Sequence, residues 1–527
     1  MSEKYDAIVI GGGHNGLVNG AYLAKAGLKT VVLEKRHLVG GAAITEELKP
    51  GFHFTTFSYA LSLLRPDIIQ ELELVKHGLM VLPMPNTFTP AENGDYLFMG
   101  PDSYQNYHEI ARHSAKDAEA YKDYWHIIKQ VVQAVKPLVD SIPPDITSSE
   151  PEELARLAAV GAHLGRQNPK VLHMLTRLLT GSAADLLDDY FETDVIKAAF
   201  CSSGLIGTKV GPRSQGSGLV LLFHKLGDFD GSIGDWGFHK GGNGGFTQAV
   251  ARAAQSFGCE IRLDAGVSEV ITKNGEAIGV ALQNGDELYG DIIVSALDPR
   301  RTFLQLVEPR DLPTDLVETI EKFKFQGVSS KVNFALDGLP EYPTLPGRTD
   351  IFQGFMNIGP TVDYIERAFD DAKYGWFSKR PYIDCCIQST IDPDMSPPGK
   401  HVMSCFVQYT PYKLKGSDWD TERENLGDVV QETLTEVFPN FSDLVLHREV
   451  VTPLDIERVT GLSEGNIFAG ELLAPQMFFL RPAPGWAQYR TPISGYYQCG
   501  SGTHPGGCVM GAPGKLAATQ ILGDLKK

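Results

Sequence analysis

A glycine-rich hexapeptide near the amino terminus, GGGHNG, is the first segment whose residue types could do chemistry. Gly11, Gly13 and Gly16 directly follow the apolar residues 5–10 and lead into an apolar helical stretch. Gly11 permits a tight turn, Gly13 lets the main chain approach a pyrophosphate, and Gly16 allows a helix to pack closely on the strand. Free N–H groups at the helix amino terminus attract the anion. The pattern therefore predicts a dinucleotide-binding turn, with a plain glycine turn as the less favoured alternative.

A carboxylate follows at the tip of the next predicted strand, residues 29–33. Glu34 can accept hydrogen bonds from a ribose diol, and its charge would repel a ribose 2′-phosphate. The dinucleotide should therefore be FAD or NAD rather than NADP. Gly40 and Gly41 supply a second close approach of the main chain, which favours FAD.

Two glycine-rich segments much later in the chain complete the predicted cofactor site. Residues 241–245 open a helix and then an antiparallel meander with Asn-Gly turns, and residues 500–507 lie between a strand and a helix. A helix amino terminus in such a loop can face the pyrimidine or ribityl part of a flavin. The elements expected here are a helix over 247–257, strands over 291–297 and 496–499, and a helix over 513–522.

Together these segments resemble the phytoene-desaturase-like flavoproteins, a branch of the FAD and amine-oxidase superfamily. The resemblance rests on GGGHNG, LEKR followed by GG, GF-x-F at residues 51–54, GGNGG, DIIVSALDP and CGSGTHPGG, and it covers most of the chain. It implies an α/β, Rossmann-like FAD-binding fold of the two-dinucleotide-binding type, with a mixed-sheet substrate domain and a helical cap. It also implies one FAD as cofactor.

The resemblance also assigns residues to the parts of FAD. It places Gly11, Gly13, Asn15 and Gly16 at the diphosphate, Glu34 and the adjoining Lys35 at the adenosine ribose, Gly41 and Ala42 at the diphosphate or ribityl chain, the Val267 main chain at the adenine, and Gly502, His504, Pro505 and Met510 at the flavin. Ala42 stands where many relatives have Arg, and Cys508 where the nearest have Gly. A thioether from Cys508 to the flavin and a non-covalent FAD both remain open.

The length of 527 residues predicts two or three compact units. We expect a discontinuous FAD-binding domain (1–100, 227–300 and 460–527), a helical cap (101–226) and a substrate-binding domain (301–459). Tyr121, Trp125, Ile128, Val132 and Val135 give the cap its helical periodicity, and the runs 382–387 and 401–409 read as strands. Cap and sheet would enclose an apolar cavity, although core packing is favoured for any one of Phe352, Phe355, Phe406 and Tyr409.

Composition excludes several classes of partner. The 47 Lys and Arg against 65 Asp and Glu give a net charge of -18, which argues against nucleic acid. No apolar run is long enough to span a membrane, and residues 1–4 leave no room for a signal peptide. We therefore expect a cytoplasmic protein, or a mitochondrial-matrix protein if the source is a eukaryote. Peripheral contact with a membrane through a local surface patch stays open. Seven cysteines without C-x-x-C spacing indicate a reducing compartment and no zinc or other metal site.

The chemistry expected is hydride transfer between a CH–CH bond of a small lipophilic substrate and flavin N5. His504 is the candidate for proton transfer, and a loop-fixing hydrogen bond is an equally weighted role. Arg481 and Arg490 could hold an acidic substrate group, although surface pairing is commoner. One alternative is an amine oxidase that produces hydrogen peroxide. Such an enzyme would need two aromatic rings facing each other beside the flavin, whereas Tyr496 and Tyr497 are adjacent in a strand and point to opposite faces. The other is an isomerase or regulatory protein with non-redox FAD; the oligomeric state is left open.

Overall fold

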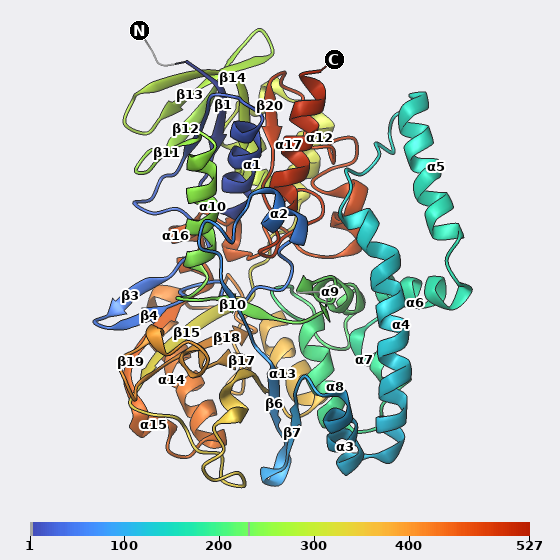
Figure 1. Ribbon diagram of the computed structural model, residues 1–527, viewed down its shortest axis with the longest axis vertical. Coiled ribbons are helices and arrows are strands. Elements are labelled where there is room, and N and C mark those ends of the chain that lie inside the picture. The colour runs from blue at the N-terminus through green and yellow to red at the C-terminus, as the bar shows by residue number, and fades with distance from the viewer. Residues whose placement is uncertain (1–3, 230–231, 527) are drawn as a thin grey trace.

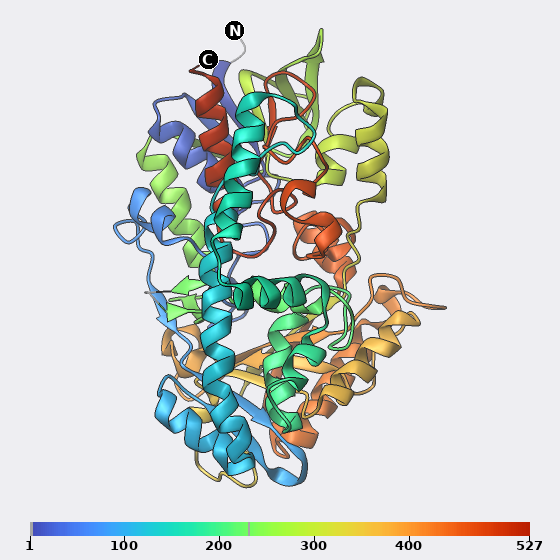
Figure 2. The same cartoon turned by 90° about the vertical axis from the view of Figure 1, so that its right-hand side faces the viewer.

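The computed structural model describes residues 4–229 and 232–526, so residues 1–3 and 527 of the expected terminal segments lie outside the described residues. Figure 1 shows one sheet with its helices in the upper half of the molecule and a second sheet in the lower half. A layer of helices runs beside both halves, with α5 at its upper end and α3 at its lower end (Figures 1 and 2).

The first sheet is built on parallel strands from distant parts of the chain. Its order is β11-β2-β1-β14-β13-β12, with β20 also pairing with β14. Ile10 of β1 lies opposite Leu33 of β2 and Ser295 of β14, and Ser295 lies opposite Gln498 of β20. The bounds are β1 Lys4–Ile10, β2 Thr30–Leu33, β11 Glu260–Arg262, β12 Val267–Lys273, β13 Glu276–Leu282, β14 Glu287–Ser295 and β20 Tyr496–Gln498. The parallel strands are β11, β2, β1, β14 and β20, and their carboxyl ends therefore share one edge.

Both faces of this sheet are covered, as in a doubly wound fold. Ala7 and Val9 pack with the helices α1 (His14–Lys25), α10 (Gly244–Ser256) and α17 (Ala512–Asp524). Ile8 and Ile10 point to the other face and pack with α11 (Pro299–Leu304), α12 (Thr314–Lys322) and the meander. Alternation of side chains along β1 thus fills two cores. The expected Rossmann-like FAD-binding fold is confirmed.

The second sheet has the order β19-β15-β18-β17-β16-β6-β7 and is mixed, because β6 and β16 are parallel while the other pairs are antiparallel. One face packs on α14 (Trp419–Val437) and α15 (Phe441–Leu444). The bounds are β6 Asn86–Pro90, β7 Tyr96–Met99, β15 Ser329–Leu336, β16 Gly354–Ile358, β17 Tyr382–Cys386, β18 His401–Gln408 and β19 Val445–Val451. The strands expected over 382–387 and 401–409 are β17 and β18.

Two segments fall outside the divisions expected from the sequence. Strands β6 and β7 belong to the second sheet, although residues 1–100 were assigned to the FAD-binding domain. Helices α11 and α12 pack on the first sheet, although α12 lies within the expected substrate-binding range 301–459. Sheet pairing and apolar packing, which join residues distant in sequence, decide both placements.

The residues expected to form a cap are helical. The seven helices are α3 Ser103–His113, α4 Ala115–Val139, α5 Pro151–Gly165, α6 Pro169–Thr180, α7 Ala183–Asp188, α8 Asp194–Cys201 and α9 Ser217–His224. Ile128, Val132 and Val135 of α4 are buried in the cap core, and Tyr121 and Trp125 are partly buried beside it. No helix within the described ranges is long and apolar enough to cross the bilayer.

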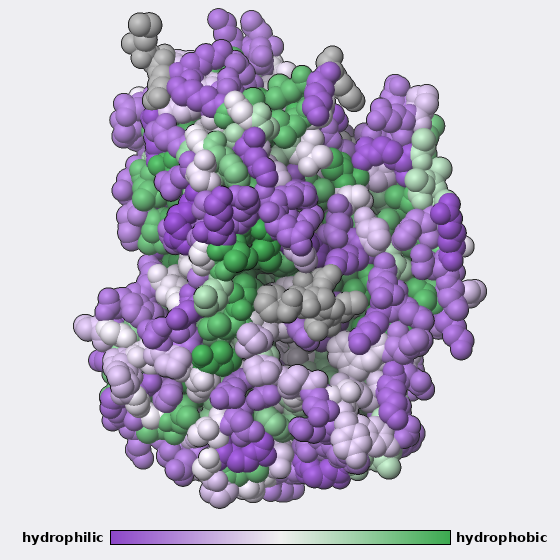
Figure 3. All heavy atoms as spheres, viewed as in Figure 1, coloured by the Kyte–Doolittle hydropathy of each residue, from purple (hydrophilic) through white to green (hydrophobic). Residues whose placement is uncertain are grey.

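The remaining elements are short connections around the two sheets. They are α2 Pro66–Glu71, α13 Val362–Lys373 and α16 Pro453–Thr460, with three small strand pairs: β3 Glu46–Lys49 with β4 Phe52–Phe54, β5 Val81–Pro83 with β10 Gly237–His239, and β8 Asp228–Phe229 with β9 Ser232–Ile233. Figure 3 shows hydrophobic side chains gathered at mid-height on one face of the molecule, between the two halves.

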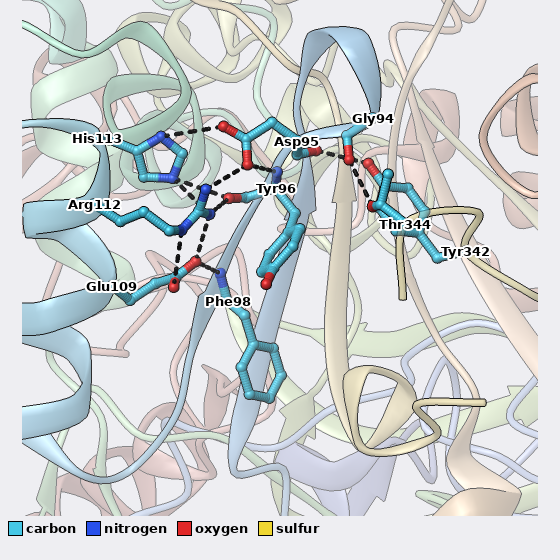
Figure 4. Close-up of polar contacts among 9 residues, drawn as sticks. All are labelled: Gly94, Asp95, Tyr96, Phe98, Glu109, Arg112, His113, Tyr342 and Thr344. Carbon is cyan, nitrogen blue, oxygen red and sulfur yellow. Dashed lines mark hydrogen bonds and ion pairs between the residues drawn. The ribbon is translucent and has the colours of Figure 1, made fainter. Parts of the chain in front are cut away.

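A polar network links the β6–β7 hairpin of the second sheet to α3 of the cap on one side and to the segment around Tyr342 on the other (Figure 4). Arg112 of α3 pairs with Asp95 and Glu109, and Glu109 accepts a hydrogen bond from the Phe98 N–H at 3.0 Å. On the other side of the turn, Tyr342 donates to the Asp95 carbonyl at 2.6 Å. The hairpin is therefore bonded to both neighbours.

The second sheet depends on a close approach between β6 and β16. A Cβ at Gly354 would lie 1.8 Å from the Asn86 carbonyl oxygen. We expect Gly354→Ala to lower the free energy of unfolding by roughly 3 kcal/mol or more, because the two strands must separate. Gly161→Ala is the matched control, since a Cβ there meets no atom within 4 Å in α5 and should be neutral or stabilising. Denaturant melts of both variants check this, and equal stability of the two would contradict it.

Candidate functional site

The glycine turn after β1 has the geometry that a phosphate-binding loop needs. Gly11 has a φ of +99°, which favours glycine, and a Cβ at Gly16 would lie 2.0 Å from the Gly11 carbonyl oxygen. The first turn of α1 can therefore pack on the strand end only with glycine at both positions. A Cβ at Gly13 would meet no protein atom within 4 Å. The space beside Gly13, at the amino terminus of α1, fits a diphosphate.

Glu34 is held by the main chain at the tip of β2. Its two carboxylate oxygens accept hydrogen bonds from Gly12 N at 2.8 Å and Arg36 N at 2.9 Å, and the residue is buried. Each oxygen retains a lone pair for a ribose hydroxyl. The Glu34 carbonyl accepts from Ala265 N at 2.8 Å, which brings the start of β12 at Val267 close by. Lys35 is exposed.

The segment after Glu34 returns to the glycine turn. Gly40 N donates to the Gly12 carbonyl at 2.8 Å, and Gly41 has a φ of +59° with its Cβ position 3.3 Å from the Gly13 Cα. Ala42 follows on the wall of a cavity below the turn. Gly41 and Ala42 thus lie between the space beside Gly13 and the cavity.

The third glycine segment lies against α1. The Asn15 side-chain amide donates to Ser501 Oγ at 3.1 Å, and Asn19 donates to the Gly514 carbonyl at 3.0 Å. The cavity is lined by Ser501, Cys508 and Val509 of this segment. The other predicted flavin contacts, Gly502, Pro505 and Met510, are buried and do not line that cavity. The glycine segments 11–16, 40–41 and 500–507 therefore meet at one edge of the first sheet, and together they fit one long dinucleotide. The predicted segment 241–245 lies beside them, where Gly244 N donates to Thr45 Oγ1 at 3.0 Å.

His504 lies on the side of the loop away from the cavity. Its ring is fully buried near the main chain of Leu138 and Val139 at the end of α4, and burial lowers its pKa to about 4. It does not line the cavity within the described structure. Its ring packs beside Phe478, and both ring nitrogens are buried without a hydrogen-bond partner in the described structure. The position therefore favours support of the loop by packing, rather than by a hydrogen bond, over proton transfer.

Cys508 reaches the cavity with an unusual backbone. Its φ of +75° lies in the left-handed region, which glycine adopts most readily. The thiol lies 3.8 Å from His224 Nε2. Burial raises the pKa of the Cys508 thiol and lowers that of His224 to about 4, so the pair is neutral. A neutral thiol is a weak nucleophile.

The cavity beside the glycine segments is mainly apolar and lies between the first sheet, the cap and the second sheet. Phe57, Ile206, Trp236, Phe406 and Phe468 form much of its wall. A second cavity of about 490 Å³ shares Tyr59, Ile206 and Trp236 with it. The two cavities are therefore neighbours, separated by these shared side chains, and reach from the glycine loops to the cap.

Lys331 is the residue of this cavity that sequence reasoning missed. It lies in β15, every residue of which is buried, and its ammonium lies 3.9 Å from the Tyr59 ring centroid and donates to Ser404 Oγ. Burial lowers its pKa to about 8. The signal in the sequence was a single charged residue inside the strand SSKVNFAL, since lysine is almost never fully buried without a reason.

Other candidate residues have structural roles. Arg481 is fully buried and donates to main-chain carbonyls, including that of Ser501, while Arg490 pairs with Asp524. Neither holds a substrate group. Tyr496 and Tyr497 bond in opposite directions, to the Thr302 carbonyl and the Asp524 carboxylate. Phe352 and Tyr409 are core residues, whereas Phe355 and Phe406 reach the cavities.

Comparison with known proteins agrees with this geometry. The family model described as flavin containing amine oxidoreductase matches residues 16–522. The chain belongs to this family. It therefore is an oxidoreductase that binds FAD.

Individual relatives cover nearly the whole chain. Pyridine nucleotide-disulfide oxidoreductase domain-containing protein 2 of Rattus norvegicus is 40% identical over 100% of this chain and 94% of its own length. A limonene dehydrogenase polypeptide of Castellaniella defragrans is 25% identical over 100% of this chain and 96% of its own. The structure of cyclohexylamine oxidase from Brevibacterium oxydans aligns with a TM-score of 0.58 at 15% identity, covering 100% of both chains, and shares the fold.

Gly13→Val should reduce bound FAD by about tenfold or more while the protein still folds, because the added side chain enters only the space beside the loop. Gly16→Ala is the contrasting variant, since its methyl group collides with the main chain of Gly11 and should impair folding itself. Flavin absorbance per chain and thermal melts separate the two effects. Full flavin occupancy in Gly13→Val would refute the assignment of the diphosphate to this turn.

Glu34→Gln should weaken FAD binding by about 1–3 kcal/mol, because a neutral amide replaces the charged acceptor of the ribose diol. Turnover at saturating FAD should not change. Titration of the apoprotein with FAD, followed by flavin fluorescence, measures the effect. An unchanged dissociation constant would place the ribose elsewhere.

Proposed function

We propose that the chain oxidises a CH–CH bond of a lipophilic organic substrate by hydride transfer. Bound FAD supplies the hydride acceptor. The observation that carries the proposal is the apolar cavity, which begins at Ala42, Ser501 and Val509 of the cofactor segments and continues between the cap and the second sheet. A cavity with such walls favours apolar groups and excludes water.

The titratable groups on the cavity wall support a proton-transfer role for Lys331. Burial lowers the pKa of both His14 and His224 to about 4, so neither ring carries a proton at neutral pH. The Lys331 pKa of about 8 keeps most of this side chain as the ammonium near neutral pH but leaves a fraction as the neutral amine, and that form can accept a proton. We therefore assign to Lys331 Nζ the proton that leaves when the substrate loses its second hydrogen.

An amine oxidase that produces hydrogen peroxide is the second candidate. The family name and the fold shared with cyclohexylamine oxidase favour it. Against it, the Lys331 ammonium within the cavity would repel a protonated amine. The likeness to a limonene dehydrogenase polypeptide supports dehydrogenation of a lipophilic substrate instead.

Identifying the substrate decides between the two. Lipids and metabolites that copurify with the FAD-loaded protein are extracted and tested for rapid bleaching of the flavin without oxygen. Bleaching by a lipophilic compound that gains a double bond supports the proposal. Bleaching by an amine, followed by peroxide formation in air, would replace it with the second candidate. No bleaching by any copurified compound would favour a non-redox role for FAD.

Lys331→Met should slow flavin reduction by roughly a hundredfold while FAD stays bound, since the variant lacks the proton-transfer group. His504→Ala should leave that rate nearly unchanged but lower thermal stability, because its ring supports the loop from outside the cavity. Anaerobic stopped-flow measurements and thermal melts distinguish the two. The reverse pattern, with slow reduction only in His504→Ala, would return the proton-transfer role to His504.

Lys331→Met should also change how the free energy of unfolding depends on pH. The folded state releases the Lys331 proton above about 8, whereas the unfolded state holds it to the ordinary pKa of 10.5. The unfolded state therefore binds more protons within this window, and the stability of the wild type gains with pH there. Lys331→Met should be more stable than the wild type at neutral pH, with the advantage shrinking towards pH 10.5. Parallel denaturant melts measure it; a constant difference would contradict the buried ammonium.

A further inference from the structure

One row of side chains crosses the second sheet on the face opposite α14. Lys331 of β15 lies opposite Phe406 of β18, Phe406 opposite Asp384 of β17, and Asp384 opposite Asn357 of β16. The neighbours along each strand, such as Val332, Cys405 and Met356, turn to the core under α14. Neighbouring strands lie about 4.8 Å apart, so Lys331 and Asp384 are about 10 Å apart along the row.

The row forms the floor of both cavities. Lys331 and Phe406 line the cavity beside the cofactor segments, and Asp384 and Asn357 line the second one, joined there by Thr89 of β6. Tyr59 borders both. An elongated molecule lying along this row would reach from the cofactor edge to the hairpin β6–β7.

The far end of the row holds polar atoms that the described structure leaves unmatched. Asp384 Oδ1 and Thr89 Oγ1 are buried without a hydrogen-bond partner, in residues that are 6% and 0% exposed. The Asn357 carbonyl oxygen accepts from Tyr382 at 2.9 Å, which leaves its amide N–H groups as donors. Unmatched buried polar groups are costly, so a polar ligand or water is expected there. Met99, Trp125 and Phe355 supply apolar wall around them.

The charges around Asp384 favour a neutral hydrogen-bond donor. Burial raises the pKa of the Asp384 carboxyl to about 7, and the Lys331 ammonium and the Tyr59 hydroxyl limit that rise. A second cation beside Asp384 would be repelled by Lys331. An anion would instead be drawn to the buried Lys225 on the cap side of the cavity, whose ammonium donates to Ser203 Oγ at 3.2 Å. A hydroxyl can donate to Asp384 and accept from Asn357 at once.

We propose that the second cavity binds the hydroxyl group of a lipophilic alcohol, with Asp384 and Asn357 as its partners, while the apolar chain extends over Phe406 towards Lys331. This inference rests on the proposed oxidation of a lipophilic substrate and specifies its class. Asp384 and Asn357 thereby select the substrate and set which carbons reach the cofactor edge.

The test compares four probes with one carbon skeleton on the FAD-loaded protein: farnesol, farnesylamine, farnesoic acid and the hydrocarbon farnesene. Calorimetry with the flavin oxidised gives each affinity. Farnesol should bind about tenfold or more tightly than farnesene, since it adds hydrogen bonds to groups otherwise unmatched. Equal binding of farnesol and farnesene, tightest binding of farnesylamine, or tightest binding of farnesoic acid would each overturn the proposal.

Two variants locate the effect. Asp384→Asn should lower farnesol affinity by about tenfold and leave farnesene unchanged, because only the charged acceptor is lost. Thr89→Val removes a hydroxyl without a protein partner, so it should fold as well as the wild type and lower farnesol affinity by about threefold. Asp394→Asn is the control, with a side chain 77% exposed. Wild-type farnesol affinity in both cavity variants would overturn the subsite.

Flavin bleaching under anaerobic conditions is recorded separately. A farnesol preference that depends on Asp384, without bleaching, supports the subsite and counts against the proposed oxidation of this probe. Bleaching at equal rates in wild type and Asp384→Asn, without a farnesol preference, supports oxidation and overturns the subsite. The two proposals can therefore fail independently.

Discussion

The parallel pairing of β1, β14 and β20 is the constraint on which the site depends. Ile10, Ser295 and Gln498 stand in one register row, although nearly the whole chain separates the first from the last. Each strand then ends at the same edge, where the glycine segments that follow β1 and β20 lie side by side. The bond from Asn19 to the Gly514 carbonyl fixes α17 beside α1 and completes this edge. If the pairing slipped, these segments would no longer fit one cofactor.

The two sheets contribute to the site in different ways. The first uses the ends of its strands, where main-chain groups and glycine loops are free to meet a ligand. The second uses one face, where alternation along β15, β17 and β16 brings Lys331, Asp384 and Asn357 to the cavity. A shift of one residue in any of these strands would turn its polar side chain into the core under α14.

How much could be predicted from the sequence follows from this difference. The turn at Gly11–Gly16 and the acid at Glu34 were predictable, because strand, turn, helix and carboxylate lie within one short stretch whose spacing favours a dinucleotide site over a plain glycine turn. Lys331 and Asp384 were not, because they become neighbours only through the pairing of β15, β18 and β17. Each is the one charged residue in a buried strand, and this local pattern marks the residue but does not show which residue lies opposite it. The pairing of β6 with β16 could not be predicted either, because nothing in the sequence of either strand indicates its partner.

Arg481 connects two loops mainly through main-chain atoms. Its guanidinium donates to the carbonyls of Phe468, Gly470, Glu471, Gln476 and Ser501. Main-chain carbonyls are the same whatever side chain the residue carries, so mutations that change side chains in these loops do not remove the bonds. The wall of the cavity can therefore diverge in sequence, and with it the choice of substrate, while the loop beside the cofactor keeps its place.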